Sequence, residues 1–194
     1  MPRVGPDRMQ PPFSRSEQMA RIRARNTSPE RELRRILWAR GLRYRLHVRT
    51  PGGRPDVVFP GARVAVFIDG CFWHGCPKHY VRPRTRGGFW SLKLKSNFER
   101  DRVQTALLER AGWRVIRIWE HEIAESLAWV ATRIEAAVRE AGPGRLPTWR
   151  VVDVAEIEGS PRRELRTMKD IRNPDRMRAV VQVRSTRKWK RRSR

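Results

Sequence analysis

The sequence predicts a mixed α/β domain in which a central mixed β-sheet is flanked by helices. Its apolar patterns follow one another in the order helix, three strands, loop, helix, strand, helix. Segment 63–69 is apolar on both faces, which is typical of a strand in the middle of a sheet that is covered on both sides. The 194 residues suffice for one core with appendages, not for two full enzymatic domains.

Local signals set the limits of these elements. Thr27 offers an N-cap hydroxyl, Pro29 suits a first helical turn, and Gly41 follows the last residue of the apolar stripe, so we expect a helix between them. Pro51-Gly52-Gly53 and Pro60-Gly61 are turn signals between extended segments. The other expected elements are strands at 44–48, 56–59, 63–69 and 113–119 and helices at 89–111 and 122–140.

The composition points to nucleic acid and excludes several classes of protein. Lys and Arg number 44 against 20 Asp and Glu, a formal net charge of +24, which favours binding to phosphates through counterion release. No run approaches the roughly 20 apolar residues of a membrane span, and the first residues lack the apolar segment of a secretory signal. Two cysteines cannot form a disulfide framework. We therefore expect a cytoplasmic, nucleoid-associated protein without a membrane partner.

Changes in composition divide the chain into three parts. Residues 1–15 form a Pro-rich leader that we expect to be flexible, and residues 16–142 carry the regular patterns of a folded domain. Residues 143–194 hold 16 basic and 6 acidic side chains, a net charge of +10, and lack a sustained apolar period. We expect this basic extension to be loosely ordered. Its end, 187–194, either lies along phosphates or serves only as a solubilising tail.

Two aspartates mark a candidate magnesium site. Asp56 begins one strand of the predicted hairpin and Asp69 ends the next, so a short turn brings both to the same edge of the sheet. Two carboxylates there suit Mg²⁺, which fills its other positions with water and phosphate. Asp56 alone could also be an ordinary turn residue. Asp69 follows five uncharged residues, where a carboxylate is costly without a partner.

A second candidate metal site uses sulfur and nitrogen ligands. Cys71, Cys76 and His79 lie within one short loop, and thiolates with imidazoles favour tetrahedral zinc. His121 is the best candidate for a fourth ligand, because strand 113–119 can lie beside strand 63–69 and end at the same edge. Such a closed site is structural. The alternative is a pair of buried cysteines with two surface histidines.

The same loop carries a histidine and two aromatic side chains. An imidazole is the side chain best suited to proton transfer near neutral pH, and His74 lies five residues after Asp69, so it could act as a general base or simply pack near zinc. Phe72 and Trp73 lie outside any core period, and Trp90 follows a basic stretch at 82–86. Such aromatics could form a wedge between base pairs, or pack in a core.

Together these residues closely resemble the very short patch repair (Vsr) DNA mismatch endonuclease family. The resemblance covers about 16–138 in one order. It rests on the motifs Met19–Thr27, Pro29-Glu30, Gly53–Asp56, Val66–His74, Phe89-Trp90, Asn97–Asp101, Gly112–Val115 and Trp119-Glu120.

The resemblance implies a restriction-endonuclease-like core with a structural zinc site. It also implies an enzyme that nicks one strand of double-stranded DNA 5′ to the thymine of a T:G mismatch, the product of 5-methylcytosine deamination. By position, Asp56 resembles the Mg²⁺ ligand, His74 the catalytic imidazole, and Asp101 and Glu30 supporting residues of the catalytic centre. The positions that resemble DNA contacts are Phe72, Trp73 and Trp90 for intercalation, Met19 and Ile22 for an N-terminal clamp, and Asn97 for DNA or for support of the centre.

The chain also departs from the family pattern. Ile68-Asp69 stands where the family has a Thr-His pair, so Asp69 becomes a candidate second Mg²⁺ ligand and Ile68 can offer only its backbone carbonyl. His121 stands where the family has a zinc-binding cysteine, which makes the predicted zinc set Cys71, Cys76, His79 and His121.

Two other functions fit the same residues. A restriction-type endonuclease would cut both strands of a matched site, and a non-catalytic, zinc-stabilised module would bind DNA without cleaving it. The resemblance favours a monomeric Mg²⁺- and Zn²⁺-dependent nickase, and it leaves open a mismatch-repair partner protein.

Overall fold

The computed structural model describes residues 26–139, 148–160 and 163–183. The predictions for Met19 and Ile22, for the leader 1–15 and for the basic run 187–194 lie outside the described residues. Among the described helices, none is both long enough and apolar enough to cross a bilayer.

The first sheet has three strands in the order β1-β2-β3. Strand β1 (Val57–Phe59) pairs antiparallel with β2 (Val64–Asp69), and β2 pairs parallel with β3 (Arg114–Trp119). The turn at Pro60-Gly61 closes the hairpin, and the parallel pair is connected through a helix, as a parallel pair requires. The prediction of a mixed sheet is therefore confirmed.

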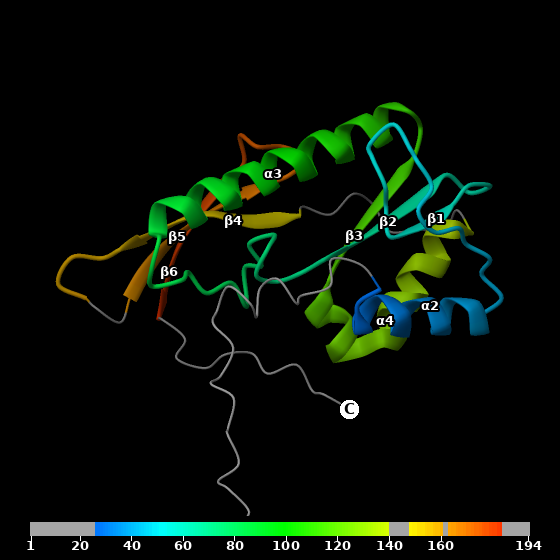
Figure 1. Ribbon diagram of the computed structural model, residues 1–194, viewed down its shortest axis with the longest axis horizontal. Coiled ribbons are helices and arrows are strands. Elements are labelled where there is room, and N and C mark those ends of the chain that lie inside the picture. The colour runs from blue at the N-terminus through cyan, green and yellow to red at the C-terminus, as the bar shows by residue number, and fades with distance from the viewer. Residues whose placement is uncertain (1–25, 140–147, 161–162, 184–194) are drawn as a thin grey trace, which may run out of the picture.

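Helices cover both faces of this sheet (Figure 1). Helices α2 (Ser28–Ala39) and α4 (Glu120–Val138) pack together on one face, and the long helix α3 (Gly87–Arg110) packs on the other. Alternate residues of β2 divide between the two faces. Val64 and Val66 join the core beneath α2 and α4, whereas Ala65 and Phe67 join Leu108 of α3. Asp69 has the same parity as Phe67 and so belongs to the α3 face.

The expected strand at 44–48 does not form. Only one isolated bridge, between Arg45 and Val58, extends the sheet on that side. His47 has a φ of 57°, a left-handed conformation that interrupts an extended segment. The sheet thus has three strands where the sequence predicted four.

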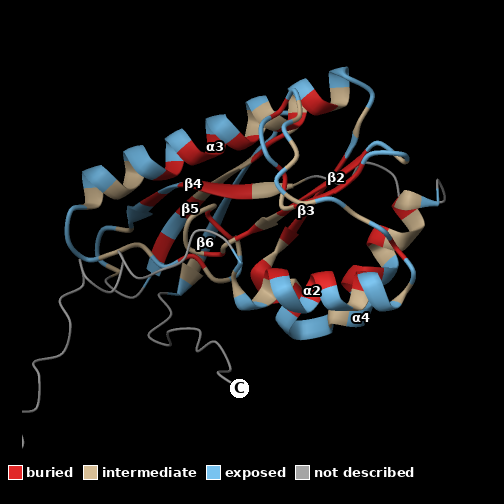
Figure 2. Cartoon of the chain, turned by 45° about the vertical axis from the view of Figure 1, so that its right-hand side comes forward, coloured by how far each residue is buried: buried red, intermediate tan, exposed pale blue. Residues whose placement is uncertain are grey.

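A second, antiparallel sheet occupies part of the basic extension. It consists of β4 (Trp149–Glu156), β5 (Arg163–Asp170) and β6 (Met177–Val183), in that order. The expectation of loose order is wrong for these strands. The physical reason is long-range packing, since β4 lies along α3 (Figures 1 and 2) and its apolar side chains join those of the preceding domain. Val151 packs with Tyr80 and Leu94, and Val152 packs with Phe98.

Candidate functional site

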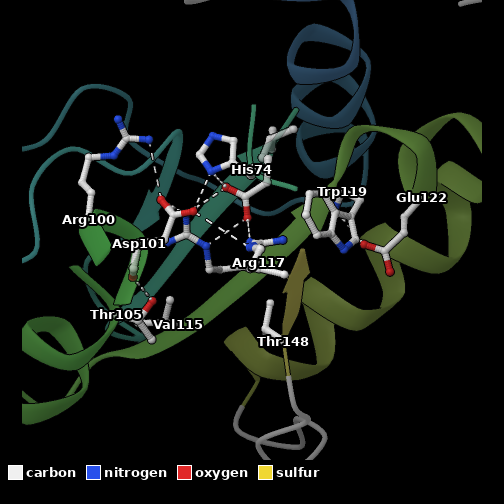
Figure 3. Close-up of polar contacts among 12 residues, drawn as sticks. His74, Arg100, Asp101, Thr105, Val115, Arg117, Trp119, Glu122 and Thr148 are labelled. Carbon is white, nitrogen blue, oxygen red and sulfur yellow. Dashed lines mark hydrogen bonds and ion pairs between the residues drawn. The ribbon is translucent and has the colours of Figure 1, made fainter. Parts of the chain in front are cut away.

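The centre of the candidate site is His74, which follows β2 and faces α3. Its Nδ1 lies 2.6 Å from Oδ2 of Asp101, at the middle of α3, and 3.4 Å from Oδ1 of Asp69, at the end of β2 (Figure 3). The side chain of His74 is 16% exposed, whereas the two aspartates are buried. Because carboxylates accept hydrogen bonds, they fix a proton on Nδ1 and leave Nε2 as the nitrogen that can accept another.

Two buried arginines neutralise these aspartates. Arg117 of β3 donates from Nε to Oδ2 of Asp69 at 2.9 Å and from Nη2 to Oδ1 at 2.8 Å, and the same Nη2 lies 2.9 Å from Oδ1 of Asp101. Arg150 of β4 donates to Oδ2 of Asp69. Burial raises the pKa of Asp69, but Arg117 and Arg150, with a further contribution from His74, hold it well below its usual range. Asp69 is therefore ionised at neutral pH.

Neither arginine was identified from the sequence. Arg117 could have been found, because it is the one charged residue within 115–119. By the alternation of side chains along a strand, it faces α3, as does Asp69 on the neighbouring strand. Its guanidinium also lies 4.5 Å from the centre of the Phe67 ring. Arg150 had no local signal. It comes from the extension that we expected to be loose, and only the packing of β4 brings it to Asp69.

Asp56 lies near this network but has different partners. Its Oδ2 accepts the backbone N–H of Ile68 at 2.7 Å, and its own N–H donates to the carbonyl of Val66. The pKa of Asp56 is raised to about 6, mainly by burial and to a smaller extent by the charges of Glu30 and Asp69, against the lowering effects of the Ile68 hydrogen bond and of Arg34. An excess of negative charge around a partly buried carboxylate is the condition that a bound cation relieves. The residues present thus fit one Mg²⁺ ligand at Asp56, beside the Ile68 backbone.

The structure gives the other predicted carboxylates their own roles. Both oxygens of Asp69 contact guanidinium groups, so its charge is already neutralised by Arg117 and Arg150, and its role as a second Mg²⁺ ligand stays a prediction. Glu30 lies at the start of α2, where it accepts the backbone N–H of Asn26 at 3.0 Å and pairs with Arg34 at 2.8 Å. Its charge reaches Asp56 while its oxygens secure the helix terminus.

The predicted zinc ligands converge on one point. Cys71, Cys76, His79 and His121 have ligand atoms within 4.8 Å of one another. The separations between Sγ and Nδ1 run from 3.2 Å (Cys71 to His121) to 4.0 Å (Cys71 to His79). Tetrahedral zinc with ordinary bond lengths would separate sulfur and nitrogen by about 3.5 Å. The four residues therefore fit the zinc ion that the sequence predicted.

The two thiols also have the chemistry of a cation site. A hydrogen bond from Cys71 lowers the pKa of Cys76 to about 4 and outweighs the effect of burial, and His121 lowers it further. Cys71 responds in the opposite sense, because its hydrogen bond with Cys76 and its burial raise its pKa. Two adjacent thiolates are costly without a cation, and zinc would supply the charge that both need.

Aromatic side chains gather beside His74. Phe72 lies between Trp73 and Trp90, with ring centres at 5.2 and 5.1 Å, and Phe89 extends the cluster from the start of α3. Phe89 is 57% exposed, so the cluster reaches the surface. Asn97 is buried and donates to the carbonyl of Trp73 at 2.7 Å. Of the two roles expected for Asn97, the geometry favours support of this loop.

The chain is similar to several known DNA endonucleases. A sequence model described as "DNA mismatch endonuclease Vsr" matches residues 7–80. The type II nicking enzyme V.NaeI of Lentzea aerocolonigenes is 50% identical over 56% of this chain and 68% of its own length. The DNA mismatch endonuclease Vsr of Escherichia coli K12 is 39% identical over 55% of this chain and 69% of its own. Among solved structures, the catalytic domain of homing endonuclease I-Bth0305I aligns with 60% of this chain and 98% of its own, at 19% identity and a TM-score of 0.41.

Removal of the predicted zinc should destabilise the protein. We expect one zinc ion per chain by atomic absorption, and a fall in Tm of roughly 10 °C or more on chelation, because structural zinc contributes several kcal/mol. His121→Ala should lose the metal, whereas His121→Cys, which replaces one zinc ligand by another, should retain it. Equal zinc content and Tm in the wild type and His121→Ala would contradict the site.

Asp56→Asn should stabilise the metal-free protein. The folded pKa of about 6 lies above the ordinary value of 3.8, so the ionised carboxylate costs roughly 2 kcal/mol at neutral pH after allowance for its exposed part. In the wild type, the stability that comes from protonation of Asp56 is fully present below pH 3.8 and is lost as the pH rises through 6. The difference in free energy of unfolding between Asp56→Asn and the wild type should therefore grow between pH 3.8 and 6. Calorimetry with and without Mg²⁺ tests both points. Mg²⁺ should raise the Tm of the wild type only, and an equal rise in the variant would exclude Asp56 as a ligand.

Proposed function

Since this chain belongs to the Vsr family of DNA mismatch endonucleases and is a DNA endonuclease, we propose that it nicks one strand of double-stranded DNA 5′ to the thymine of a T:G mismatch. The observation that carries the proposal is the 2.6 Å pair between His74 and Asp101, in a loop whose aromatic cluster reaches the surface at Phe89, in a strongly basic chain. We propose further that the core is restriction-endonuclease-like, and that the monomeric protein acts in the nucleoid.

In the proposed reaction, His74 is the general base. Asp101 and Asp69 hold the proton on Nδ1, so Nε2 takes a proton from a water molecule that attacks the scissile phosphorus in line. The bond from phosphorus to the 3′-oxygen breaks, which leaves a 3′-hydroxyl and a 5′-phosphate. A Mg²⁺ ion held by Asp56 would stabilise the charge that develops on the phosphate oxygens. Arg117 holds Asp69, and Asp69 keeps the His74 imidazole oriented when DNA displaces water from the site.

Selectivity for the mismatch is assigned to the aromatic cluster. Insertion of Phe72, Trp73 and Trp90 beside a base pair requires unstacking, which costs a few kcal/mol per step and is cheaper next to a wobble pair. The rings already contact one another, so they can enter as one wedge. Zinc at the neighbouring cysteines, together with Asn97, would keep the loop that carries them in place.

His74→Ala should lower the nicking rate by about 10²-fold or more while DNA binding is retained, because the variant loses the base but no phosphate contact. The assay uses strand-labelled duplexes with T:G, T:A and C:G pairs in several contexts, with and without Mg²⁺. His47→Asn is the control, since His47 is exposed and left-handed, and Asn tolerates that conformation. Cleavage of both strands of matched DNA would favour a restriction-type enzyme, and binding without Mg²⁺-dependent cleavage would favour a non-catalytic module.

Trp73→Ala should reduce the preference for nicking T:G over T:A duplexes by roughly tenfold, since part of the wedge is lost, and it should lower Tm only slightly. Trp73→Phe should keep most of the preference because a ring remains. Trp38→Ala is the control, because Trp38 is 54% exposed on α2, away from α3 and the catalytic loop. An unchanged ratio of nicking rates in Trp73→Ala would remove this tryptophan from mismatch recognition.

A further inference from the structure

Strand β4 lies in backbone contact with the loop that carries His74. The N–H of Val151 donates to the carbonyl of Gly75 at 2.8 Å. Gly75 has a φ of +66°, and a Cβ at that position would lie 2.3 Å from the carbonyl oxygen of Val151. Only glycine permits this approach without a shift of the backbone. The residue next to His74 is thus held by Val151, which lies 76 positions further along the chain.

Other contacts join the second sheet to the same loop. Tyr80 and Leu94 share an apolar cluster with Val151 and Val154, and Phe72 packs against that cluster. Arg166 of β5 donates to the carbonyl of Pro77 at 3.5 Å. The sheet therefore supports both the aromatic side of the loop and the zinc side.

Arg150 carries this support into the catalytic centre. Its guanidinium pairs with Oδ2 of Asp69 and lies 3.9 Å from the centre of the Trp119 ring. The side chain is 1% exposed, and its Nε and Nη1 have no hydrogen-bond partner within the part of the chain that the structure describes. A buried arginine with unsatisfied N–H groups is a poor source of stability, because the cost of removing its charge from water is only partly recovered. Its position points to a role at Asp69.

We propose that Arg150 is a positioning residue of the endonuclease centre, and that the 149–183 sheet belongs to the catalytic domain through it. Asp69 reaches His74 with Oδ1 at 3.4 Å, while Arg150 and Arg117 hold its other oxygen. Without Arg150, the carboxylate is held by Arg117 alone, and the cluster of two aspartates and two arginines gains a net negative charge. Asp69 would then turn or shift against the imidazole. This inference rests on the proposed role of His74.

The test compares Arg150→Gln and Arg150→Lys with the wild type in the full-length protein. Arg172→Gln is the matched control. Arg172 also ties the second sheet to the first domain, through Glu109 at 3.1 Å and the carbonyl of Val115 at 3.0 Å. The measurements are kcat and KM on a T:G duplex and Tm by circular dichroism.

We expect Arg150→Gln to lower kcat by roughly tenfold to a hundredfold with KM little changed, because a small misplacement of a catalytic group costs about that much. Arg150→Lys keeps the charge but not the planar guanidinium, so its kcat should lie between those of the wild type and Arg150→Gln. Arg172→Gln should lower Tm and leave kcat near that of the wild type.

Three results would overturn the inference. They are a kcat of Arg150→Gln within twofold of the wild type, equal losses of kcat in Arg150→Gln and Arg172→Gln, and a failure of both Arg150 variants to fold, which would make Arg150 a general stabiliser. A wild-type protein that does not cleave would instead reject the proposed function, so the two failures are distinguishable.

Discussion

The candidate site depends on a buried group of opposite charges. Asp69 and Asp101 lie with Arg117 and Arg150 in a region that water hardly reaches, and their formal charges cancel. Loss of one partner would leave an uncompensated buried charge, which costs several kcal/mol, so each member constrains the others. His74 is the exposed end of this group. Its imidazole takes its orientation from two carboxylates that the arginines hold in place.

The loop from Cys71 to Tyr80 is short, yet three independent sets of contacts hold it. The cluster of Cys71, Cys76, His79 and His121 lies on one side, Asp101 and Asn97 of α3 hold the other, and β4 reaches the backbone between them at Gly75. A proton acceptor that must lie within hydrogen-bond reach of an attacking water gains from such a rigid base. The same rigidity serves the aromatic rings, because a wedge can force base pairs apart only if it does not yield itself.

The sequence could predict those features whose signals come from residues close together in the chain. Thr27, Pro29 and Gly41 set the limits of α2 by local rules, and Asp56 and Asp69 reached the same sheet edge because a short hairpin requires it. The zinc ligands were found because three of them lie within nine residues. Asp101 came only from the family resemblance, as a supporting residue of the catalytic centre, and its contact with His74 was not predicted, since no local rule joins a loop to the middle of a distant helix. Arg150 could not be found, because its strand is stabilised by packing on α3 and not by a pattern of its own.

The distribution of charge then separates binding from chemistry. The net charge of +24 comes from side chains outside the buried group, since that group is neutral as a whole. Attraction to the DNA backbone therefore comes from side chains other than those that orient His74. Around Asp56 the balance differs, because the charges of Glu30 and Asp69 raise its pKa against the lowering effect of Arg34. The structure thus combines a candidate cation site at Asp56 with an oriented imidazole at His74, as the proposed reaction requires.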